Sequence, residues 1–311
     1  MKLLDKIAGK VHFKLFGMRC DIRPGIRYFD ETHFDGLIKE DFEFKNDNGF
    51  TLRGGYYHYE NFDKDTLVIF CHGIGGGHQA YMKEIEYIAR NGFKVLSYDY
   101  QGSILSDGDN LGGFSLALKD MVKCIDLIKD NYKHIYVIGH SWGGWVAQGA
   151  AYLSDDVEKV VLLAGMNSLE TLCDQYVKGP LKIFKKPFLK LEYEKYGEIS
   201  KLKASESLNK KNLKALVIQS KDDSILKLKY NFEKIKEAST NKEVKFIETD
   251  GKNHNPTYTL DAVKKLNEYL SKLNKLKDKA EIEKLADSTN WDELCDLDLE
   301  IMDEIISFIK A

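Results

Sequence analysis

The sequence lacks long apolar runs and has few cysteines. No stretch of eighteen apolar residues occurs in the 311-residue chain, which excludes a transmembrane helix. The five cysteines form no C-x-x-C pair, and an odd set of this kind is typical of buried thiols in a reducing compartment rather than of a disulfide framework. The composition therefore predicts a cytoplasmic protein.

An excess of charge of either sign is also missing. The 46 basic and 49 acidic residues give a formal net charge of −3 and are spread along most of the chain. No basic footprint stands out, so nucleic acid is not an expected partner. A chain of this length can bury a sizeable core, and we expect a globular fold. The sequence indicates no particular oligomeric state.

Residues 1–40 are expected to form a helix and a lead-in to the main fold. Charged residues interrupt the apolar positions of the first twenty residues and no small-residue cleavage site follows, which argues against a signal peptide. Helical spacing of Leu4, Ile7, Val11 and Leu15 predicts an amphipathic helix with these residues on its apolar face. We expect the helix to pack on its own domain; a weak contact with a membrane surface is the alternative.

From residue 41 the chain alternates between strand and helix patterns. Two alternating segments surround Asn48-Gly49, which predicts a β-hairpin. Helices are expected between most of the later strands, one of them N-capped by Ser115. Six short apolar runs fit strands buried on both faces of a sheet: 66–71, 94–99, 134–139, 160–165, 215–220 and 244–249. The pattern predicts the α/β class, with a mostly parallel, eight-stranded sheet and helices on both faces.

One long connection interrupts the alternation. Residues 166–212 contain aromatic side chains among many lysines and are too long for a simple crossover. We expect a small helical cap over the carboxyl ends of the strands, where open α/β sheets bind ligands; a decoration without substrate contact is the alternative. The core would then comprise residues 41–165 and 213–311.

The C-terminal tail is acidic but has a helical pattern. Asn290 followed by Glu293 resembles a capping signal. Apolar residues then recur at helical spacing: Leu294, Leu297, Ile301, Ile305 and Phe308. We expect one helix that packs on the sheet; a helix that binds a partner is the alternative.

Ser141 lies between glycines directly after a predicted strand. The segment from Gly139 to Gly143 matches G-x-S-x-G and precedes an alanine-rich helical stretch, which is the order in which this motif forms a nucleophile elbow. The glycines are needed because a side chain beside the strained turn would collide with the neighbouring strand or helix. We therefore expect Ser141 to be a nucleophile rather than a small residue in an ordinary turn.

A nucleophilic serine needs a base and an acid that orients the base. His254 is the only histidine after Ser141, and it follows the predicted strand at 244–249. Asp222 and Asp223 follow the preceding strand, and either could be the acid. The loops after these strands leave one edge of the sheet, so the three groups can converge in the chain order serine, acid, histidine. For His254 the alternative is a polar surface loop.

The glycine-rich loop after the strand at 66–71 is expected to face the oxyanion of a tetrahedral intermediate. Backbone N–H groups of Ile74 and Trp142 are the expected donors, and Gly73 and Gly75 would let the main chain approach the substrate. Neither phosphate-binding glycine motif is present, so a nucleotide is not expected there. His72 is expected to be a structural hydrogen-bonding residue.

These segments together resemble the α/β-hydrolase superfamily, and specifically its monoacylglycerol-lipase-like and serine-aminopeptidase-like branch. The resemblance runs from about residue 41 to the C-terminus and is carried by HGIGGGHQAY, YDYQGSILSDG, GHSWGG, QSKDDSIL and GKNH. It implies the α/β-hydrolase fold and selects Asp223 over Asp222, because the acid of this family precedes a small residue and two apolar ones. Gln101 and Ser103 stand where relatives often carry arginine and histidine, so the specificity need not follow the best-known lipases.

The implied function is that of a serine hydrolase. We expect it to cleave carboxylic esters with an apolar acyl chain through Ser141, Asp223, His254 and an acyl-enzyme, with no metal or organic cofactor. The expected substrates are small or lipid-like esters of the carboxylesterase, monoacylglycerol lipase or lysophospholipase kind. Amidase or aminopeptidase activity, acyl transfer and a catalytically silent binding protein are the alternatives.

Overall fold

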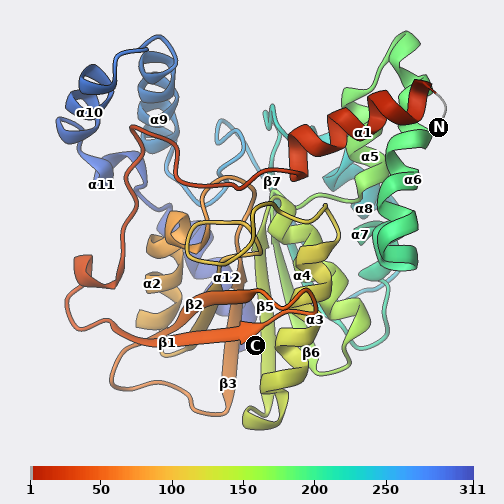
Figure 1. The fold of residues 1–311 in the computed structure, drawn as a ribbon. Helices are drawn as coiled ribbons and strands as arrows, with labels where there is room; N and C mark the ends of the chain where they lie inside the picture. The colour runs from red at the N-terminus through yellow and green to blue at the C-terminus, as the bar shows by residue number, and fades with distance from the viewer. Residues whose placement is uncertain (1–2) are drawn as a thin grey trace.

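The computed structural model describes residues 3–311, which are built around one sheet (Figure 1). Within these residues eight strands pair in the order β1-β2-β4-β3-β5-β6-β7-β8. β2 is antiparallel to both β1 and β4, and every other neighbouring pair is parallel. The strands span Ile38–Lys45 (β1), Thr51–His58 (β2), Thr66–Cys71 (β3), Lys94–Tyr98 (β4), His134–His140 (β5), Val157–Leu163 (β6), Lys214–Ser220 (β7) and Val244–Thr249 (β8). The predicted α/β class and the mostly parallel, eight-stranded sheet are confirmed.

The central strands are apolar on both faces because helices cover both. Along β3, Leu67 and Ile69 face one helical layer, Val68 and Phe70 face the other, and all four are buried. One layer contains α3 (Leu116–Ile128), α4 (Trp142–Leu153) and α8 (Phe232–Ala238), and the other contains α2 (Met82–Arg90) and α12 (Leu299–Lys310). The parallel strands share one carboxyl edge, and the loops that leave them there lie close together.

The long connection between β6 and β7 is helical. It comprises α5 (Leu169–Tyr176), the 3₁₀ helix η4 (Gly179–Phe184), α6 (Lys185–Tyr196), the 3₁₀ helix η5 (Gly197–Lys201) and α7 (Ala204–Ser207). The N-terminal helix α1 (Leu3–Phe16) packs against α6 and η4, and Figure 1 shows it in red beside the green α6. We call residues 166–212 the cap. Two segments that are far apart in the sequence thus form one side of the molecule.

The predicted apolar face of α1 is wrong in its second half: Leu4 and Ile7 are partly buried, but Val11 and Leu15 are not on the packed side. Ala8 and Phe16 are buried and His12 points the same way, whereas Val11 and Leu15 are exposed. The helix is rotated because Phe16 packs on aromatic residues beside the serine turn and His12 reaches a buried carboxylate on α6. These two contacts with distant residues outweigh the apolar strip that the spacing suggested.

Ser115 stands at the N-cap position of α3 as predicted, but its side chain does not cap the helix. Ser115 has helical backbone angles, and its hydroxyl makes no capping bond to α3. The carboxylate of Glu192, on α6 of the cap, accepts hydrogen bonds from the N–H of Phe114 over 2.7 Å and from the N–H and hydroxyl of Ser115 over 3.1 Å and 2.9 Å. A negative charge at this end of α3 is favourable, because the helix dipole places its positive end there.

The C-terminal tail forms separate helices instead of the single helix expected from residue 290. Asn290 does cap a short helix, α11 (Trp291–Leu294), which follows α9 (Leu260–Leu273) and α10 (Lys279–Asp287). The chain then leaves the helical path, because Leu297 pairs with Tyr258 in an isolated β-bridge and Asp298 caps α12. The packing of the last helix on the sheet is confirmed, since most of the apolar side chains of α12 are buried there.

None of the helices within residues 3–311 combines the length and the apolar character that crossing a membrane requires.

Candidate active site

Ser141 lies in a tight turn between β5 and α4. Its backbone has φ 57° and ψ −117°, a conformation that costs a non-glycine residue on the order of 1–3 kcal/mol. A Cβ atom on Gly139 would lie 2.1 Å from the carbonyl oxygen of Gly143, and one on Gly143 would lie 2.1 Å from that of Cys71. Glycine is therefore required at both positions, and the strained turn holds Ser141 at the carboxyl edge of the sheet.

His254 lies between Ser141 and Asp223. Its Nε2 atom is 2.9 Å from Ser141 Oγ, and its Nδ1 atom is 3.0 Å and 3.1 Å from the two carboxylate oxygens of Asp223. Asp223 stands in the loop after β7 and His254 in the loop after β8. The fold thus brings together three side chains that are far apart in the sequence, at the distances that proton transfer from a serine to a histidine requires.

The carboxylate of Asp223 is buried and held in one orientation. One oxygen accepts hydrogen bonds from the N–H groups of Ile225 and Leu226, over 2.9 Å and 2.8 Å, and the other accepts one from Gln219 over 3.0 Å. Backbone donors of this kind leave little freedom for the side chain to rotate. Asp223 therefore presents a fixed acceptor to His254 Nδ1.

Asp222 has a different place. One of its carboxylate oxygens lies 2.5 Å from the hydroxyl of Ser220 and accepts the N–H of Asn253 over 3.1 Å. These bonds connect the loop after β7 with the residue directly before His254. Of the two neighbouring aspartates, Asp223 bonds to the His254 ring and Asp222 bonds to its loop.

Tyr81 and His140 connect the glycine loop to His254. The hydroxyl of Tyr81 accepts the N–H of Gly73 over 3.0 Å and lies 2.8 Å from His140 Nδ1, while His140 Nε2 lies 2.7 Å from the carbonyl oxygen of His254. Because a carbonyl oxygen only accepts, Nε2 carries the proton and Tyr81 donates to Nδ1. Burial, and secondly the nearby His254, lower the pKa of His140 to about 3, so the ring is neutral at physiological pH.

The glycine loop after β3 lies against Ser141. A Cβ atom on Gly73 would be only 3.3 Å from the Cβ atom of Ser141, and Gly75 has φ +108°, which favours glycine. Ile74 lies between them and is half exposed. Trp142 is the first residue of α4, so its N–H has no partner inside the helix. The glycine loop and the first turn of α4 thus both border Ser141.

His72 holds the start of the glycine loop through two hydrogen bonds. Its Nδ1 donates to the carbonyl oxygen of Gly73 over 2.6 Å, and its Nε2 accepts the N–H of Tyr100 over 3.1 Å. Burial lowers its pKa to about 4, so the ring is neutral and its hydrogen bonds are fixed. The structural hydrogen-bonding role expected of His72 is confirmed.

Comparison with known proteins supports the family indicated by this geometry. Residues 63–211 match the family model described as serine aminopeptidase, S33. An esterase from Pyrococcus furiosus, Pf2001, aligns with 86% of this chain and 97% of its own at 20% identity, with a TM-score of 0.57. The α/β hydrolase GrgF from a Penicillium species aligns with 75% of this chain and 97% of its own at 18% identity, with a TM-score of 0.54. Acetyl xylan esterase 1 from Thermoanaerobacterium covers 81% of this chain and 88% of its own at 17% identity, with a TM-score of 0.53.

The chain shares its fold with these esterases and with the α/β hydrolase GrgF, and the family match covers slightly less than half of its length. Among curated proteins, no sequence matches it. The resemblance stated from the sequence is thus confirmed for the superfamily, and the solved structures show that the fold is shared.

The cap contacts the loop that carries Asp223. Side chains of Gln175 and Tyr176, at the end of α5, both donate to the carbonyl oxygen of Ile225 over 2.6 Å. Gln175 also accepts the N–H of Lys227 over 2.9 Å. The cap therefore helps to position the acid loop.

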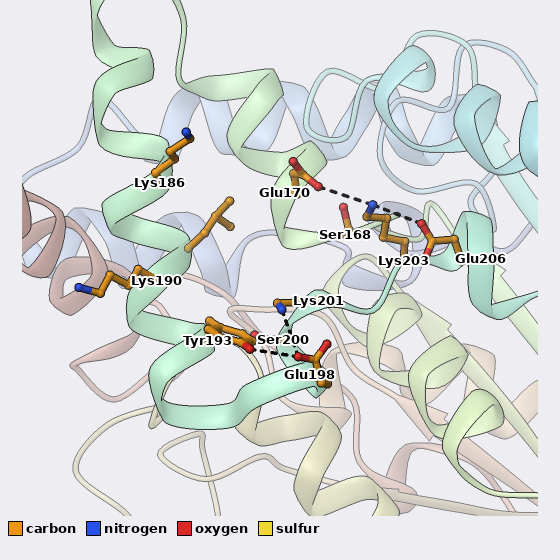
Figure 2. Close-up of a pocket in the computed structure, with 11 residues that line it drawn as sticks. Ser168, Glu170, Lys186, Lys190, Tyr193, Glu198, Ser200, Lys201, Lys203 and Glu206 are labelled. Carbon is orange, nitrogen blue, oxygen red and sulfur yellow. Dashed lines mark hydrogen bonds and ion pairs between the residues drawn. The ribbon is translucent and has the colours of Figure 1, made fainter.

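A cavity of about 560 Å³ lies inside the cap, between α5, α6 and the segment from η5 to α7 (Figure 2). Figure 2 shows Lys186, Lys190 and Tyr193 on one side and the chain of ion pairs Glu170–Lys203–Glu206 on the other. None of its lining residues belongs to the group formed by Ser141, Asp223 and His254. This charged cavity is separate from the serine site.

Several residues at the site were missed by sequence reasoning. Tyr81 and His140 belong to the site only through their hydrogen bonds, and the one available signal was the position of His140 directly before Ser141. Glu192, buried in the cap, also accepts a hydrogen bond from His12 of α1 over 2.6 Å. Gln101, which departs from the family pattern, accepts a hydrogen bond from Asn46 over 2.9 Å and so supports the hairpin of β1 and β2.

Among residues 3–311, no group of three or more histidine, cysteine or acidic side chains is arranged to hold a metal ion.

Proposed function

We propose that this α/β hydrolase cleaves carboxylic esters with an apolar acyl chain, using Ser141 as nucleophile, His254 as general base and Asp223 as the acid that orients the base. The observation that carries the proposal is the position of His254, 2.9 Å from Ser141 Oγ and 3.0 Å from the nearer carboxylate oxygen of Asp223. A serine hydroxyl is a weak nucleophile at neutral pH unless a base of this kind takes its proton.

The first half of the reaction forms an acyl-enzyme. His254 Nε2 takes the proton as Ser141 Oγ attacks the ester carbonyl carbon, and Asp223 stabilises the resulting imidazolium through Nδ1–H. Negative charge then develops on the former carbonyl oxygen, toward which we place the N–H groups of Ile74 and Trp142. The carbon–oxygen bond to the alcohol breaks, and the alcohol leaves with the proton from His254.

The second half releases the acid. A water molecule gives a proton to His254 and attacks the acyl carbon, and the bond to Ser141 Oγ breaks as that proton returns to the serine. Each group ends in the state in which it began. The strained turn supports this role because the hydroxyl of Ser141 makes no capping hydrogen bond to α4 and lies beside His254 instead.

The ester class is supported by two observations. Two of the structurally similar proteins named above are esterases, and one of them aligns with 86% of this chain. The loops at the site also expose apolar side chains, namely Ile74 of the glycine loop and Ile225 of the acid loop. An apolar acyl chain would cover these side chains from water, at about 25 cal/mol for each Å² of apolar surface.

The test uses purified protein and p-nitrophenyl esters of increasing chain length. We expect wild-type turnover that rises from the acetate to a longer acyl chain, and loss of turnover in Ser141→Ala. Wild-type turnover in Ser141→Ala would refute the assignment. A preference for aminoacyl p-nitroanilides over every ester would replace the proposal with an aminopeptidase, and ester consumption that depends on an added alcohol acceptor would replace it with an acyltransferase.

A further inference from the structure

Helix α1 has a second apolar side that the fold does not cover. Its packed side carries Ala8 and Phe16, which are buried. Leu3, Val11 and Leu15 are 71%, 48% and 48% exposed, and their spacing places them together on another side of the helix. About half or more of the surface of each of these side chains therefore stays accessible to solvent.

The 3₁₀ helix η4 adds to this surface. It packs beside α1, and Leu181 and Ile183 within it are each 57% exposed. Single exposed apolar residues are ordinary, but a group of them on two neighbouring elements marks a binding surface. We call Leu3, Val11, Leu15, Leu181 and Ile183 the apolar surface.

The segments that carry the apolar surface are rich in lysine, although the whole chain has a net charge of −3. Residues 177–191 contain five lysines and no acidic residue, and α1 contains three lysines and one aspartate. Most of them have no acidic partner. Within the part of the chain that the structure describes, no ion pair is made by Lys6, Lys10, Lys14, Lys178, Lys182 and Lys186.

The same elements reach the serine site. The ring of Phe16, at the end of α1, lies 6.3 Å from the indole of Trp142, the residue after Ser141. Figure 1 shows α1 and the cap at one end of the molecule, beside the loops that leave the carboxyl edge of the sheet. A flat partner that covers the apolar surface would therefore lie near the serine site.

We propose that α1 and η4 dock this hydrolase on an anionic lipid bilayer and that its ester substrates are drawn from that bilayer. The proposal rests on the esterase function proposed above. Apolar side chains bordered by lysines are typical of helices that lie in the plane of a membrane interface. A bilayer is favoured over a protein because the lysines without an ion pair are distributed over α1 and residues 178–186 rather than gathered at one point. A diffuse layer of negative charge complements all of them at once.

The test is co-sedimentation of the full chain, in its Ser141→Ala form, with vesicles of phosphatidylcholine alone or mixed with phosphatidylglycerol. We expect binding to the mixed vesicles that weakens at high salt. Lys6→Gln/Lys10→Gln/Lys14→Gln should lower the apparent affinity by roughly fivefold for each lysine, the equivalent of about 1 kcal/mol each. Val11→Glu/Leu181→Glu should abolish binding, because it places carboxylates in the apolar layer.

Matched controls lie near the amino ends of the strands, away from α1 and η4; Lys211, although within residues 166–212, stands just before the start of β7. Lys211→Gln/Lys242→Gln/Lys245→Gln removes the same charge, and Leu127→Glu changes one exposed leucine of α3. These variants should bind as the parent does. With Ser141 restored, every variant should hydrolyse a soluble short-chain ester at the wild-type rate, while Val11→Glu/Leu181→Glu loses activity on a monoacylglycerol in mixed vesicles.

Three results would overturn the docking proposal. The first is no binding to the mixed vesicles, and the second is equal binding by the α1 variants and their controls. In the third, the parent does not bind vesicles and Val11→Glu/Leu181→Glu changes the oligomeric state measured by light scattering. That result would assign the apolar surface to contact with a second copy of the chain. Failure of the esterase proposal is seen separately, as absent turnover of the soluble ester.

Discussion

His140 Nε2 donates to the carbonyl oxygen of His254 over 2.7 Å, so the residue before the serine holds the backbone of the proposed general base. The other ring nitrogen of His140 accepts from Tyr81, whose hydroxyl accepts from Gly73 of the glycine loop. The proposed base and the proposed oxyanion loop are thus connected by one chain of hydrogen bonds. This chain makes Tyr81 and His140 positioning residues rather than groups that touch the substrate.

Tyr81→Phe should lower kcat more than it changes KM. The substitution removes one hydroxyl and leaves the N–H of Gly73 and Nδ1 of His140 without their partner. Because these groups position the proposed base and the glycine loop and do not bind the substrate, we expect kcat to fall by about tenfold, or roughly 1.4 kcal/mol in activation free energy. Steady-state kinetics on a soluble ester measure this, with Tyr152→Phe on the exposed side of α4 as the control. An unchanged kcat would show that the hydrogen-bond chain has no positioning role.

The two neighbouring aspartates should respond differently to amidation. In Asp223→Asn the new amide can donate a hydrogen bond to His254 Nδ1, which favours the imidazole tautomer that cannot accept the serine proton at Nε2. We expect kcat to fall on the order of 10³-fold to 10⁴-fold. Asp222→Asn keeps an acceptor oxygen for Ser220 and Asn253, so activity should change only a few-fold. Equal losses in the two variants would contradict the assignment of Asp223. Thermal unfolding of both variants checks that neither loss comes from misfolding.

Ser141→Gly should be more stable than Ser141→Ala. Both remove the hydroxyl, but only glycine relieves the strained φ of 57°. After allowance for the greater freedom of glycine in the unfolded chain, we expect a difference of about 1 kcal/mol in the free energy of unfolding. Chemical denaturation of the two inactive variants measures it. Greater stability of the alanine variant would argue against stored strain at this position.

Glu84 should make the stability of the protein depend on pH. Burial raises the pKa of its carboxyl to about 7 in the folded state, against 4.5 in an ordinary environment. The folded state therefore binds the Glu84 proton more tightly than the unfolded state does. The stabilisation that this proton gives is fully present below pH 4.5 and is lost as the pH rises through about 7. Glu84→Gln keeps an acceptor for the hydroxyl of Thr257 and cannot ionise.

The variant should consequently gain stability relative to wild type as pH rises. We expect the difference in unfolding free energy between Glu84→Gln and wild type to increase by about 3 kcal/mol between pH 4.5 and pH 8. Urea denaturation at the two pH values provides the measurement. A difference that stays constant with pH would show that Glu84 is ionised in the folded protein.

The strands and the serine turn could be predicted from the sequence because their signals are local. Apolar runs such as the one ending at Cys71 need burial on both faces. The glycines around Ser141 form a recognisable local motif, although the contact that requires Gly143 comes from Cys71 on β3. The candidate acid and base followed from the chain order and from the shared edge of a parallel sheet.

The features that were predicted wrongly depend on distant partners. The orientation of α1 is set by Glu192, 180 residues away from His12. The same carboxylate takes the place of the cap expected from Ser115. In the tail, the pairing of Leu297 with Tyr258 interrupts a helical pattern that would otherwise continue. No spacing of residues along the chain indicates such pairs.

The measurement that tests the central claim most directly is the rate at which a fluorophosphonate modifies Ser141. Intact mass and peptide mapping after reaction with limiting probe should place a single adduct on Ser141 in the wild-type protein. The rate should fall by on the order of 10³-fold or more in His254→Ala, since the hydroxyl then has no base. An adduct elsewhere, or equal rates of modification with and without His254, would contradict the account of Ser141 as a nucleophile activated by this histidine.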